Sequence, residues 1–494
     1  MSVKFRVCIL GGGTAGWMSA NLLHKYWAQQ GAQISLVESP QIGIIGVGEG
    51  STPQLKQFFQ LLDISEQEWM PACNATYKTG IAFHHWTSHK TNNHYFHPFP
   101  SPLDRQTATS FMMHSNMRAQ GMDIDVQPDD FFLSTYLSQH YYTPVQKNLG
   151  TPLNYAYHFD AQRLGEFLRK KAVQNGVAHK QAKLEHVAFG ETGQIEHLRF
   201  DDGSQECADL FIDCSGFNSE LLQKACKIPF VSFADNLFND SAVALPSSNS
   251  EVHRAQTTAT ALGHGWAWHI PLTNRIGNGY VYSSAYVSAQ DAESALRTHI
   301  GSTASEQAAR HLKMKVGRVA EHWHKNVLAI GLSQGFIEPL EATALHLVQE
   351  TLMQFINAVS LSVPLEQQTT ARAEFNHTIN QRFEGIRDYI VCHYKLNTRE
   401  DTDYWRDNRN NQVLSENLQA VLDTWYAGKD ITHILTERKM TGYYPVLSWY
   451  CILAGYQYFK PATAANKLNM SALQQMQRAF AQHAEQFIPL TKSN

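Results

Sequence analysis

Residues 4–17, KFRVCILGGGTAGW, decide the fold of this 494-residue chain. The apolar run before the glycines is typical of a buried parallel strand, and it ends in the spacing Gly11-x-Gly13-x-x-Gly16. The residues that follow, 17–27, predict a helix. Glycines at such a turn let the backbone approach a pyrophosphate, which the N–H groups of the helix start can bind. The expected nucleotide contacts in this turn are Gly11, Gly13, Thr14, Ala15 and Gly16.

A second strand is predicted over residues 34–37, and Glu38 follows it directly. A carboxylate at this distance from the glycine turn can accept hydrogen bonds from ribose hydroxyls. The order strand, glycine turn, helix, strand and acid predicts an α/β, Rossmann-like nucleotide-binding domain. A glycine turn in a Rossmann-like unit that binds no ligand is the alternative.

Two later segments favour FAD over NAD. Residues 209–217, DLFIDCSGF, predict a hydrophobic strand followed by a Ser-Gly turn, and resemble the second nucleotide-contacting strand of flavoprotein monooxygenases. Residues 327–331, VLAIG, predict another strand that ends at glycine. The sequence has no second GxGxxG unit, so a built-in nicotinamide site is not expected. The flavin would then arrive already reduced.

The composition excludes several classes of partner. Forty basic and 44 acidic residues leave a net charge of −4, so the chain lacks the excess of positive charge that binding to nucleic acid or an anionic membrane requires. No run approaches the roughly 18 apolar residues of a membrane span, and the amino terminus is too short in apolar residues for a signal peptide. Seven scattered cysteines without a CxxC pair predict reduced thiols and a cytoplasmic location. The 24 histidines lack the spacing of a metal site, so no metal is expected.

Several further segments, in order along the chain, resemble the flavin-dependent tryptophan halogenases, and the resemblance runs nearly end to end. They are ATYKTG (75–80), GWAWHIP (265–271), GLSQGFIEPLEATALHL (331–347) and, near the first strands, GVGEGSTP (46–53). On pattern alone, Trp266 and Trp268 share one face of a strand and are ordinarily core residues. In the halogenases WxWxIP is diagnostic, and it is proposed to keep bulky substrate away from the flavin. The glycine-rich segment resembles the family's mobile strap over the flavin, with a flexible loop as the alternative.

The resemblance implies a fold and an activity. The fold would be a flavin monooxygenase-type FAD-binding domain with a mainly helical substrate-binding domain. The activity would be FADH2- and O2-dependent chlorination or bromination of an electron-rich aromatic, with an indole expected, through hypohalous acid made at the flavin from chloride or bromide. A separate NAD(P)H-dependent flavin reductase and a homodimer are implied as well. A flavin-dependent aromatic hydroxylase and a non-catalytic flavin-binding sensor are the alternatives, and neither needs WxWxIP.

The resemblance assigns the catalytic roles to Lys78 and Glu341. An ammonium at Lys78 could polarise hypohalous acid, or an amine there could form a haloamine. Glu341 could orient the oxidant with Lys78, or take the proton from the halogenated ring as a general base. The alternatives are a solvated loop lysine and a carboxylate favoured by the dipole at a helix start. Glu338 ranks below Glu341.

The resemblance also assigns halide and flavin contacts. The halide would bind the backbone of Thr343 and Ala344, at the start of a helix predicted over 341–355. The family more often has Gly at the second of these positions. Leu332 and Leu345 correspond to positions beside the flavin, and Val187 corresponds to another nucleotide contact.

Substrate contacts follow from two aromatic segments. HYFHPFP (94–100) resembles the family segment whose His and Phe flank the substrate, which assigns His97 and Phe99. WYCILAG (449–455) matches another family word, and aligning on it assigns Tyr443 and Tyr444 to a pair that sandwiches the indole. On the same alignment Lys439 replaces the carboxylate that holds the substrate ammonium in tryptophan-specific members. A lysine would repel that group, so a bare or differently substituted indole, or a larger phenolic or peptide-like substrate, fits better than free tryptophan.

The domain organisation expected from these placements is a flavin domain over residues 1–360. Residues 76–150 would form an insertion that contributes to the substrate cavity. Residues 361–494 would form a mainly helical domain that caps the substrate, with its last helix over 472–487.

Overall fold

The computed structural model describes residues 5–41, 48–88, 93–124, 126–148, 150–249, 252–301, 306–463 and 470–491. The chain forms two compact units, each built from three separate segments. The first unit contains Met1–Ala75, Phe159–Phe233 and Met314–Phe383. The second unit contains Thr76–His158, Ala234–Lys313 and Glu384–Asn494.

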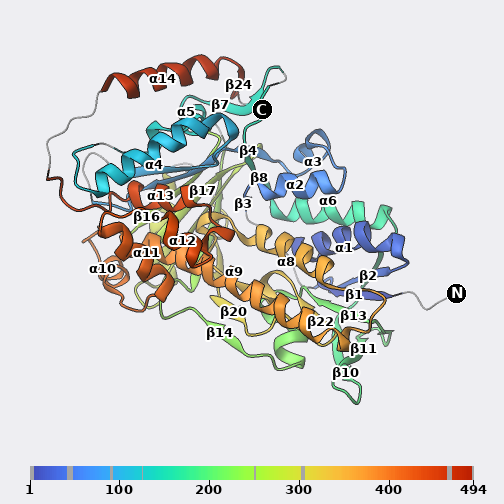
Figure 1. Ribbon diagram of the computed structural model, residues 1–494. Helices are drawn as coiled ribbons and strands as arrows, with labels where there is room; N and C mark the ends of the chain where they lie inside the picture. Colours follow the sequence, from blue (N-terminus) through green and yellow to red (C-terminus); the bar gives the residue numbers. More distant parts are fainter. Residues whose placement is uncertain are drawn as a thin grey trace. The chain divides into compact units, whose positions relative to one another are not determined.

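The first unit is built on a six-stranded sheet in the order β21-β22-β13-β1-β2-β9. Four of these strands, β1, β2, β13 and β22, are labelled in Figure 1. All neighbouring pairs run parallel except β21 and β22, which run antiparallel. This sheet confirms the Rossmann-like α/β fold. Its strands are β1 (Arg6–Leu10), β2 (Gln33–Glu38), β9 (Ala178–Gln181), β13 (Leu210–Asp213), β21 (Trp323–His324) and β22 (Val327–Ala329).

Helices pack beside this sheet, as expected for parallel strands that are buried on both faces. Helix α1 (Thr14–Trp27) contacts both α6 (Ala161–Gln174) and α8 (Ala344–Ala358) (Figure 1). The Asp160 carboxylate caps α6 by accepting from two backbone N–H groups of its first turn. The other helical elements of this unit are η1 (Ala28–Gln30), α2 (Gln54–Leu61), α3 (Glu66–Ala72), η4 (Gly216–Asn218), the π-helix η5 (Glu220–Ala225), η7 (Gly331–Ser333), η8 (Pro339–Glu341) and η9 (Leu365–Gln367).

Two small antiparallel sheets complete the first unit. One has the order β10-β11-β12 and the other the order β14-β20-β23. The apolar side of the first of these packs on the same core as strands β1 and β13. The strands of these two sheets are β10 (Leu184–Phe189), β11 (Ile195–Phe200), β12 (Gln205–Glu206), β14 (Phe230–Ser232), β20 (Gly317–Val319) and β23 (Gly335–Phe336). The first unit also contains β3 (Gly48–Gly50), which belongs to neither of them.

The second unit is built on a seven-stranded sheet in the order β19-β15-β18-β17-β16-β5-β6. Neighbours run antiparallel except β5 and β16, which run parallel. The WxWxIP segment is strand β17, and Trp268 on it packs against Gly279 of β18, where a Cβ would lie 2.0 Å from the indole. The strands are β5 (Gly80–His84), β6 (His94–Pro98), β15 (Ser241–Ser247), β16 (Thr257–Leu262), β17 (Gly265–Pro271), β18 (Ile276–Tyr282) and β19 (Arg310–Lys313).

Two further strand pairs belong to this unit. Strand β4 (Thr76–Lys78) pairs antiparallel with residues 156–158 of β8 (Ala156–Asp160). Strand β24 (Phe487–Pro489) pairs with β7 (Tyr142–Gln146). The helix predicted over 472–487 is therefore wrong at its end, because Phe487 is buried in a strand and the helix, α14 (Met470–Ala484), stops before it.

The segment after residue 361 is largely helical, as expected. Helix α9 (Thr369–Leu396) belongs to the first unit up to Phe383 and to the second unit from Glu384. The remaining helical elements of the second unit are η2 (Pro102–Asp104), α4 (Arg105–Ala119), η3 (Pro128–Asp130), α5 (Leu133–Gln139), α7 (Ala289–Ile300), α10 (Asp403–Asn410), α11 (Glu416–Tyr426), α12 (Thr432–Glu437), η10 (Met440–Gly442) and α13 (Val446–Gly455).

The two compact units bear on the expected organisation of the chain. The first segment of the second unit is residues 76–158. Residues 234–313, which we expected within the flavin domain, group with that segment. The insertion over 76–150, the flavin domain over 1–360 and the capping domain over 361–494 remain predictions. Among the described residues, no helix is both long enough and apolar enough to cross a membrane.

Candidate functional site

The turns that follow strands β1, β13 and β22 each contain glycine, and they lie side by side at the carboxyl ends of these parallel strands. Two backbone hydrogen bonds join the strand ends: Cys214 N–H donates to the Leu10 carbonyl at 2.9 Å, and Ile330 N–H donates to the Asp213 carbonyl at 2.9 Å. Gly331, just beyond β22, has a φ of +73° and lies so close to Ala15 that a Cβ would be 2.8 Å from the alanine methyl. The carboxyl ends of parallel strands are where nucleotides bind in such folds.

The glycine turn after β1 fits a dinucleotide. A Cβ at Gly16 would lie 2.0 Å from the Gly11 carbonyl oxygen, so these glycines let helix α1 pack closely on the strand. Gly13, in contrast, faces open space with nothing within 4 Å of an added Cβ. Gly13 is also the N-cap of α1 and makes no side-chain cap hydrogen bond. The helix start, with Thr14 and Ala15, is therefore open to a pyrophosphate.

The Glu38 carboxylate lies directly beside this turn. A Cβ at Gly12 would come within 1.6 Å of Glu38 Oε2, so Gly12 makes room for the carboxylate. Glu38 Oε1 lies 2.8 Å from His179 Nε2, and the His179 ring makes an edge contact with Trp17 at 5.1 Å between centroids. His179 was missed at the level of sequence, because it is 141 residues away and has no motif around it.

The start of helix α8 corrects one prediction. We expected a helix from residue 341, but Glu341 ends the short helix η8 and Ala342 has a left-handed backbone with φ +56°. Helix α8 begins at Ala344 with Thr343 as its N-cap. Glu341 therefore lies two residues before the N-cap of α8 and not in its first turn, so the predicted helix start at 341 is wrong. Its side chain is 3% exposed.

The predicted halide and flavin residues lie on η7, at the start of α8 and on β10. Thr343, the N-cap of α8, is buried and makes no side-chain cap hydrogen bond to the first turn of the helix. Leu332 lies within η7 and Leu345 within the first turn of α8, and both are half-buried. Val187 lies on β10 and packs against the hydrophobic core to which strand β1 also contributes. These assignments remain predictions.

Lys78 is the last residue of β4 in the second unit, and its side chain is completely buried. The interpretation of Lys78 as a solvated loop lysine is therefore wrong. Its Nζ lies 5.5 Å from the centroid of the Phe99 ring. Phe99 is held in place because its N–H donates to the Thr79 carbonyl at 3.0 Å. A predicted catalytic residue and a predicted substrate residue are thus neighbours.

His97 and Tyr444 meet around a residue that we did not predict, Tyr389. The Tyr389 and Tyr444 rings stack at 3.7 Å with 8° between their planes. The His97 ring centroid lies 5.9 Å from that of Tyr389, and His97 Nε2 lies 3.0 Å from Ser448 Oγ. Tyr389 donates to the Ser448 carbonyl at 3.0 Å. The side chains of Tyr389 and Ser448 therefore tie the two predicted substrate residues into one aromatic cluster.

Tyr443 and Tyr444 do not form two parallel walls. Their ring centroids are 5.6 Å apart and their planes are tilted by 59°. Tyr444 is buried and Tyr443 half-buried. The parallel partner of Tyr444 is Tyr389, so the role of Tyr443 in holding an indole remains a prediction.

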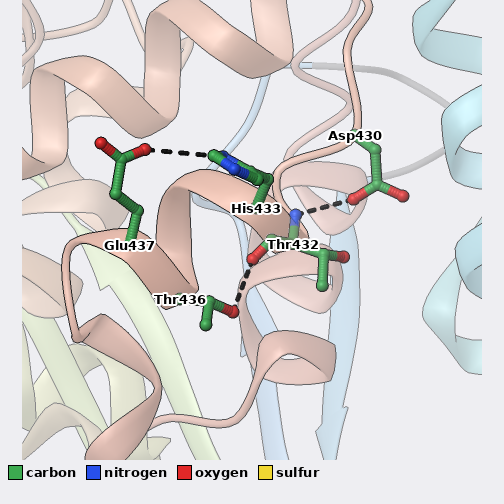
Figure 2. A pocket seen from close by; sticks show the side chains of 5 residues that line it. All are labelled: Asp430, Thr432, His433, Thr436 and Glu437. Atoms are coloured by element: carbon green, nitrogen blue, oxygen red, sulfur yellow. Dashed lines mark hydrogen bonds and ion pairs between the residues drawn. The ribbon is translucent and has the colours of Figure 1, made fainter.

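An open surface depression of about 530 Å³ lies beside helix α12 (Figure 2). Its lining includes His433, which faces Glu437 at 3.5 Å and is 88% exposed. Small-molecule sites enclose most of the surface of their ligand, whereas this depression is open, and none of the predicted site residues lines it. We therefore do not assign it to the substrate. The lining residues are Asp430, Thr432, His433, Thr436 and Glu437.

The predicted residues divide between the two units. The first unit contains the glycine turn, Glu38, Leu332, Glu341 and the start of α8. The second unit brings Lys78 close to Phe99 and links His97 to Tyr444 through Tyr389. The joint action of Lys78 and Glu341, which lie in different units, remains a prediction. No group of three or more potential metal-ligating side chains occurs in the part of the chain that the structure describes.

Comparisons with known proteins agree over nearly the whole chain. A family model described as tryptophan halogenase matches residues 6–471. The 7-chloro-L-tryptophan 6-halogenase of Kutzneria sp. (strain 744) is 36% identical over 491 residues, covering 92% of each chain. The tryptophan 7-halogenase of Lentzea aerocolonigenes is 34% identical, covering 91% of this chain and 89% of that protein. Among solved structures, the tryptophan 6-halogenase of Streptomyces toxytricini superposes with a TM-score of 0.84 at 31% identity, covering 99% of both chains. A flavin-dependent halogenase of Brevundimonas sp. BAL3 gives 0.82 at 28% identity, covering 98% of this chain and 97% of that one.

Proposed function

This chain belongs to the tryptophan halogenase family, and from that premise we propose that it halogenates an indole-like arene with FADH2, O2 and chloride or bromide. It is a flavin-dependent halogenase, so the two alternative interpretations of the sequence, an aromatic hydroxylase and a non-catalytic flavin sensor, are set aside. The observation that carries the proposal for the chemistry is the fully buried Lys78 on a strand beside Phe99. Reduced FAD, when bound, supplies hypohalous acid from O2 and halide.

The nucleotide is proposed to lie along the glycine turns of the first unit. The open start of α1 would bind the pyrophosphate, and Glu38, held by His179, would accept from the ribose hydroxyls. Leu332 and Leu345 would flank the ring system, and Val187 would add a further contact. The N–H groups of Thr343 and Ala344 would hold the halide. An anion is favoured there because the positive end of the helix dipole lies at the start of α8.

Lys78 is proposed to receive the hypohalous acid and direct it at the arene. A cation in a buried place polarises such an oxidant strongly, since few competing dipoles of water surround it. Glu341, 3% exposed, is proposed to take the proton that leaves the halogenated ring, or to orient the oxidant with Lys78. Trp266 and Trp268 on β17, both buried, are proposed to keep the arene away from the flavin.

The substrate is proposed to be an electron-rich aromatic, with indole as the parent ring. The aromatic cluster around Tyr389 offers ring faces for stacking, together with the polar groups of His97 and Ser448. Lys439 is exposed, with a left-handed backbone at φ +55° between α12 and η10. Its charge supports a substrate without a free ammonium group next to it, whereas the relatives described above are named for tryptophan or chlorotryptophan.

A separate NAD(P)H-dependent flavin reductase is proposed to supply FADH2, because the sequence contains one dinucleotide turn only. A cytoplasmic location and a homodimer are proposed as well. All seven cysteines are free, which supports a reducing compartment.

The test is an assay of the purified chain with FAD, a flavin reductase, NADH and bromide. An arene panel should include indole, L-tryptophan, a phenol and an indole-containing peptide. We expect brominated product from at least one indole, with the product depending on halide and on the reductase. Hydroxylated product without bromination would instead establish the hydroxylase, and bound flavin without any product would establish the sensor.

A further inference from the structure

His158 lies where four strands of the second unit meet, and it is completely buried. Its Nδ1 is 3.1 Å from Thr76 Oγ1 on β4, and its Nε2 is 2.9 Å from Thr257 Oγ1 at the start of β16. The Thr76 hydroxyl in turn donates to the carbonyl of Pro271, at the end of β17, at 2.7 Å. We call this set of four residues the His158 chain.

The His158 chain determines which ring nitrogen carries the proton. The Thr76 hydroxyl has one hydrogen, and that hydrogen goes to the Pro271 carbonyl, which can only accept. Thr76 Oγ1 must therefore accept from His158, so Nδ1 carries the proton. Nε2 is then left to accept a hydrogen from the Thr257 hydroxyl. Every donor has an acceptor only if the imidazole is neutral and has its proton on Nδ1.

The His158 chain also touches the strand that carries Lys78. Thr76 and Lys78 are two residues apart on β4, so their side chains point to the same face of the strand. In the β4–β8 pair, Thr76 lies opposite His158 and Lys78 lies opposite Ala156. Burial, then the Lys78 charge and the His269 charge, hold the pKa of His158 well below its ordinary value. The ring therefore stays uncharged beside the lysine.

The other end of the His158 chain reaches the tryptophan segment. Pro271 is the last residue of β17, the strand that carries Trp266 and Trp268. The Thr76 hydroxyl thus ties the lysine strand to the tryptophan strand through one partly buried hydrogen bond. A shift of β4 against β17 would break this bond and leave buried polar groups without partners, which is costly.

We propose that the His158 chain is a positioning device that holds Lys78 in register with the WxWxIP strand, with His158 as a neutral imidazole protonated on Nδ1. This inference rests on the proposed function, in which Lys78 receives the hypohalous acid. His158 and Thr76 are positioning residues, because they act through the placement of Lys78. Their loss lets oxidant escape from the arene without preventing its formation.

The test compares Thr76→Val, which keeps the shape and removes the hydroxyl, with Thr76→Ser, which keeps the hydroxyl. Thr402→Val is the matched control, because Thr402 in the same unit also donates to a carbonyl, that of Gly263, at 2.7 Å. For each variant one measures halogenated arene formed per NADH consumed. A 1,3-diketone that captures escaped hypohalous acid is included in a parallel reaction. FAD binding and thermal unfolding are measured on the same preparations.

We expect Thr76→Val to lower product per NADH by about tenfold, since small displacements of reacting groups are expensive. Trapped hypohalous acid should rise to match, while Thr76→Ser and Thr402→Val stay within about twofold of the unchanged protein. Equal coupling in Thr76→Val and Thr402→Val would overturn the inference. If Thr76→Val fails to fold, Thr257→Val tests the other ring nitrogen with the same expectation.

A second readout does not depend on turnover. In protein labelled with ¹⁵N-histidine, the His158 signal, assigned by its loss in His158→Gln, should be that of a neutral ring protonated on Nδ1 from pH 8 down to pH 6. A charged ring or the opposite tautomer would refute the proposed chain. Failure of the proposed function would appear differently, as a lack of halide-dependent product in the unchanged protein.

Discussion

The ammonium of Lys78 faces the ring of Phe99 at 5.5 Å from its centroid, and both groups lie in the second unit. A cation beside an aromatic face gains electrostatic stabilisation when water is excluded. The ring therefore shields one side of the Lys78 ammonium, and Phe99 is also a proposed substrate contact.

Replacing Lys78 with Ala should lower arene halogenation at least about 100-fold, the usual scale for loss of a group that polarises or transfers a proton. FAD binding should be unchanged, because the glycine turn and Glu38 lie in the other unit. Hypohalous acid should still form and be captured by a trap. Full product formation by this variant with normal flavin binding would remove the lysine from the mechanism.

Replacing Phe99 with Leu should raise the KM for the arene by roughly fivefold, because a ring face for stacking and a shield for Lys78 are lost together. Phe99→Tyr retains the ring and should remain within twofold of the unchanged protein. Steady-state kinetics with indole, at saturating halide and reductase, compare the two. Equal KM values for the Leu and Tyr variants would contradict a role for the ring face.

Replacing Glu38 with Ala should weaken FAD binding roughly tenfold, as expected for loss of a charge-assisted hydrogen bond to a ribose. His179→Ala should give a smaller loss, because Glu38 remains but is no longer held at 2.8 Å. Flavin fluorescence titration measures both. Glu185→Ala, a largely exposed acid on β10, serves as the control and should bind FAD normally.

Replacing Lys439 with Glu should raise kcat/KM for L-tryptophan relative to indole by roughly fivefold, the scale of an exposed charge interaction. Lys429→Glu makes the same charge change at another exposed position and should leave this ratio unchanged. Competition assays with both substrates in one reaction give the ratio directly. No change in the ratio would mean that residue 439 does not face the substrate.

His322 should make the first unit sensitive to acid. Burial, together with the nearby Arg318 charge, lowers its pKa to about 3. In the unfolded chain the imidazole titrates near 6.5, so below that pH the unfolded state takes up a proton that the folded state does not. Stability is therefore lost as pH falls from 6.5 towards 3, by about 2 kcal/mol between pH 7 and pH 5.

The comparison for this prediction is His322→Gln against His433→Gln, which changes a histidine that is 88% exposed. Urea unfolding at pH 7 and pH 5 measures the loss for each protein. We expect the first variant to lose less stability on acidification than the unchanged protein, and the second to behave like it. Identical acid losses in both variants would contradict the assignment to His322.

The sequence was most informative where a local steric demand determines the structure. The turn at Gly11 and Gly16 could be predicted because the backbone is so close there that a Cβ at Gly16 would lie 2.0 Å from the Gly11 carbonyl oxygen. Only glycine, which has no Cβ, fits at that position. The late start of α8 could not be, since Ala342 takes a left-handed backbone that no glycine or asparagine announces. Local sequence patterns therefore predict the glycine turn, but they do not predict the irregular backbone before α8.

The site residues that were missed share a different cause. His179, Tyr389 and His158 act through contacts with residues far away in the chain, and their own neighbours carry no spacing rule. His158 meets Thr76 across 82 residues and Thr257 across 99. The contacts of His158 and His179 depend on how the strands assemble, whereas Tyr389 lies on helix α9 and meets Tyr444 through helix packing. Neither kind of contact could be predicted from periodicity.

The central sheet of the first unit takes its five parallel strands from residues 6–10, 33–38, 178–181, 210–213 and 327–329. A ribosome must therefore have made about two-thirds of the protein before β22 can dock beside β13, and the turn at Gly331 comes later still. Until then the backbone N–H and C=O groups along one edge of β13 lack the strand that pairs with them, and such an open edge is prone to aggregation. Heterologous production should accordingly benefit from slower synthesis or added chaperones, with flavin uptake possible only after translation has passed the third glycine turn.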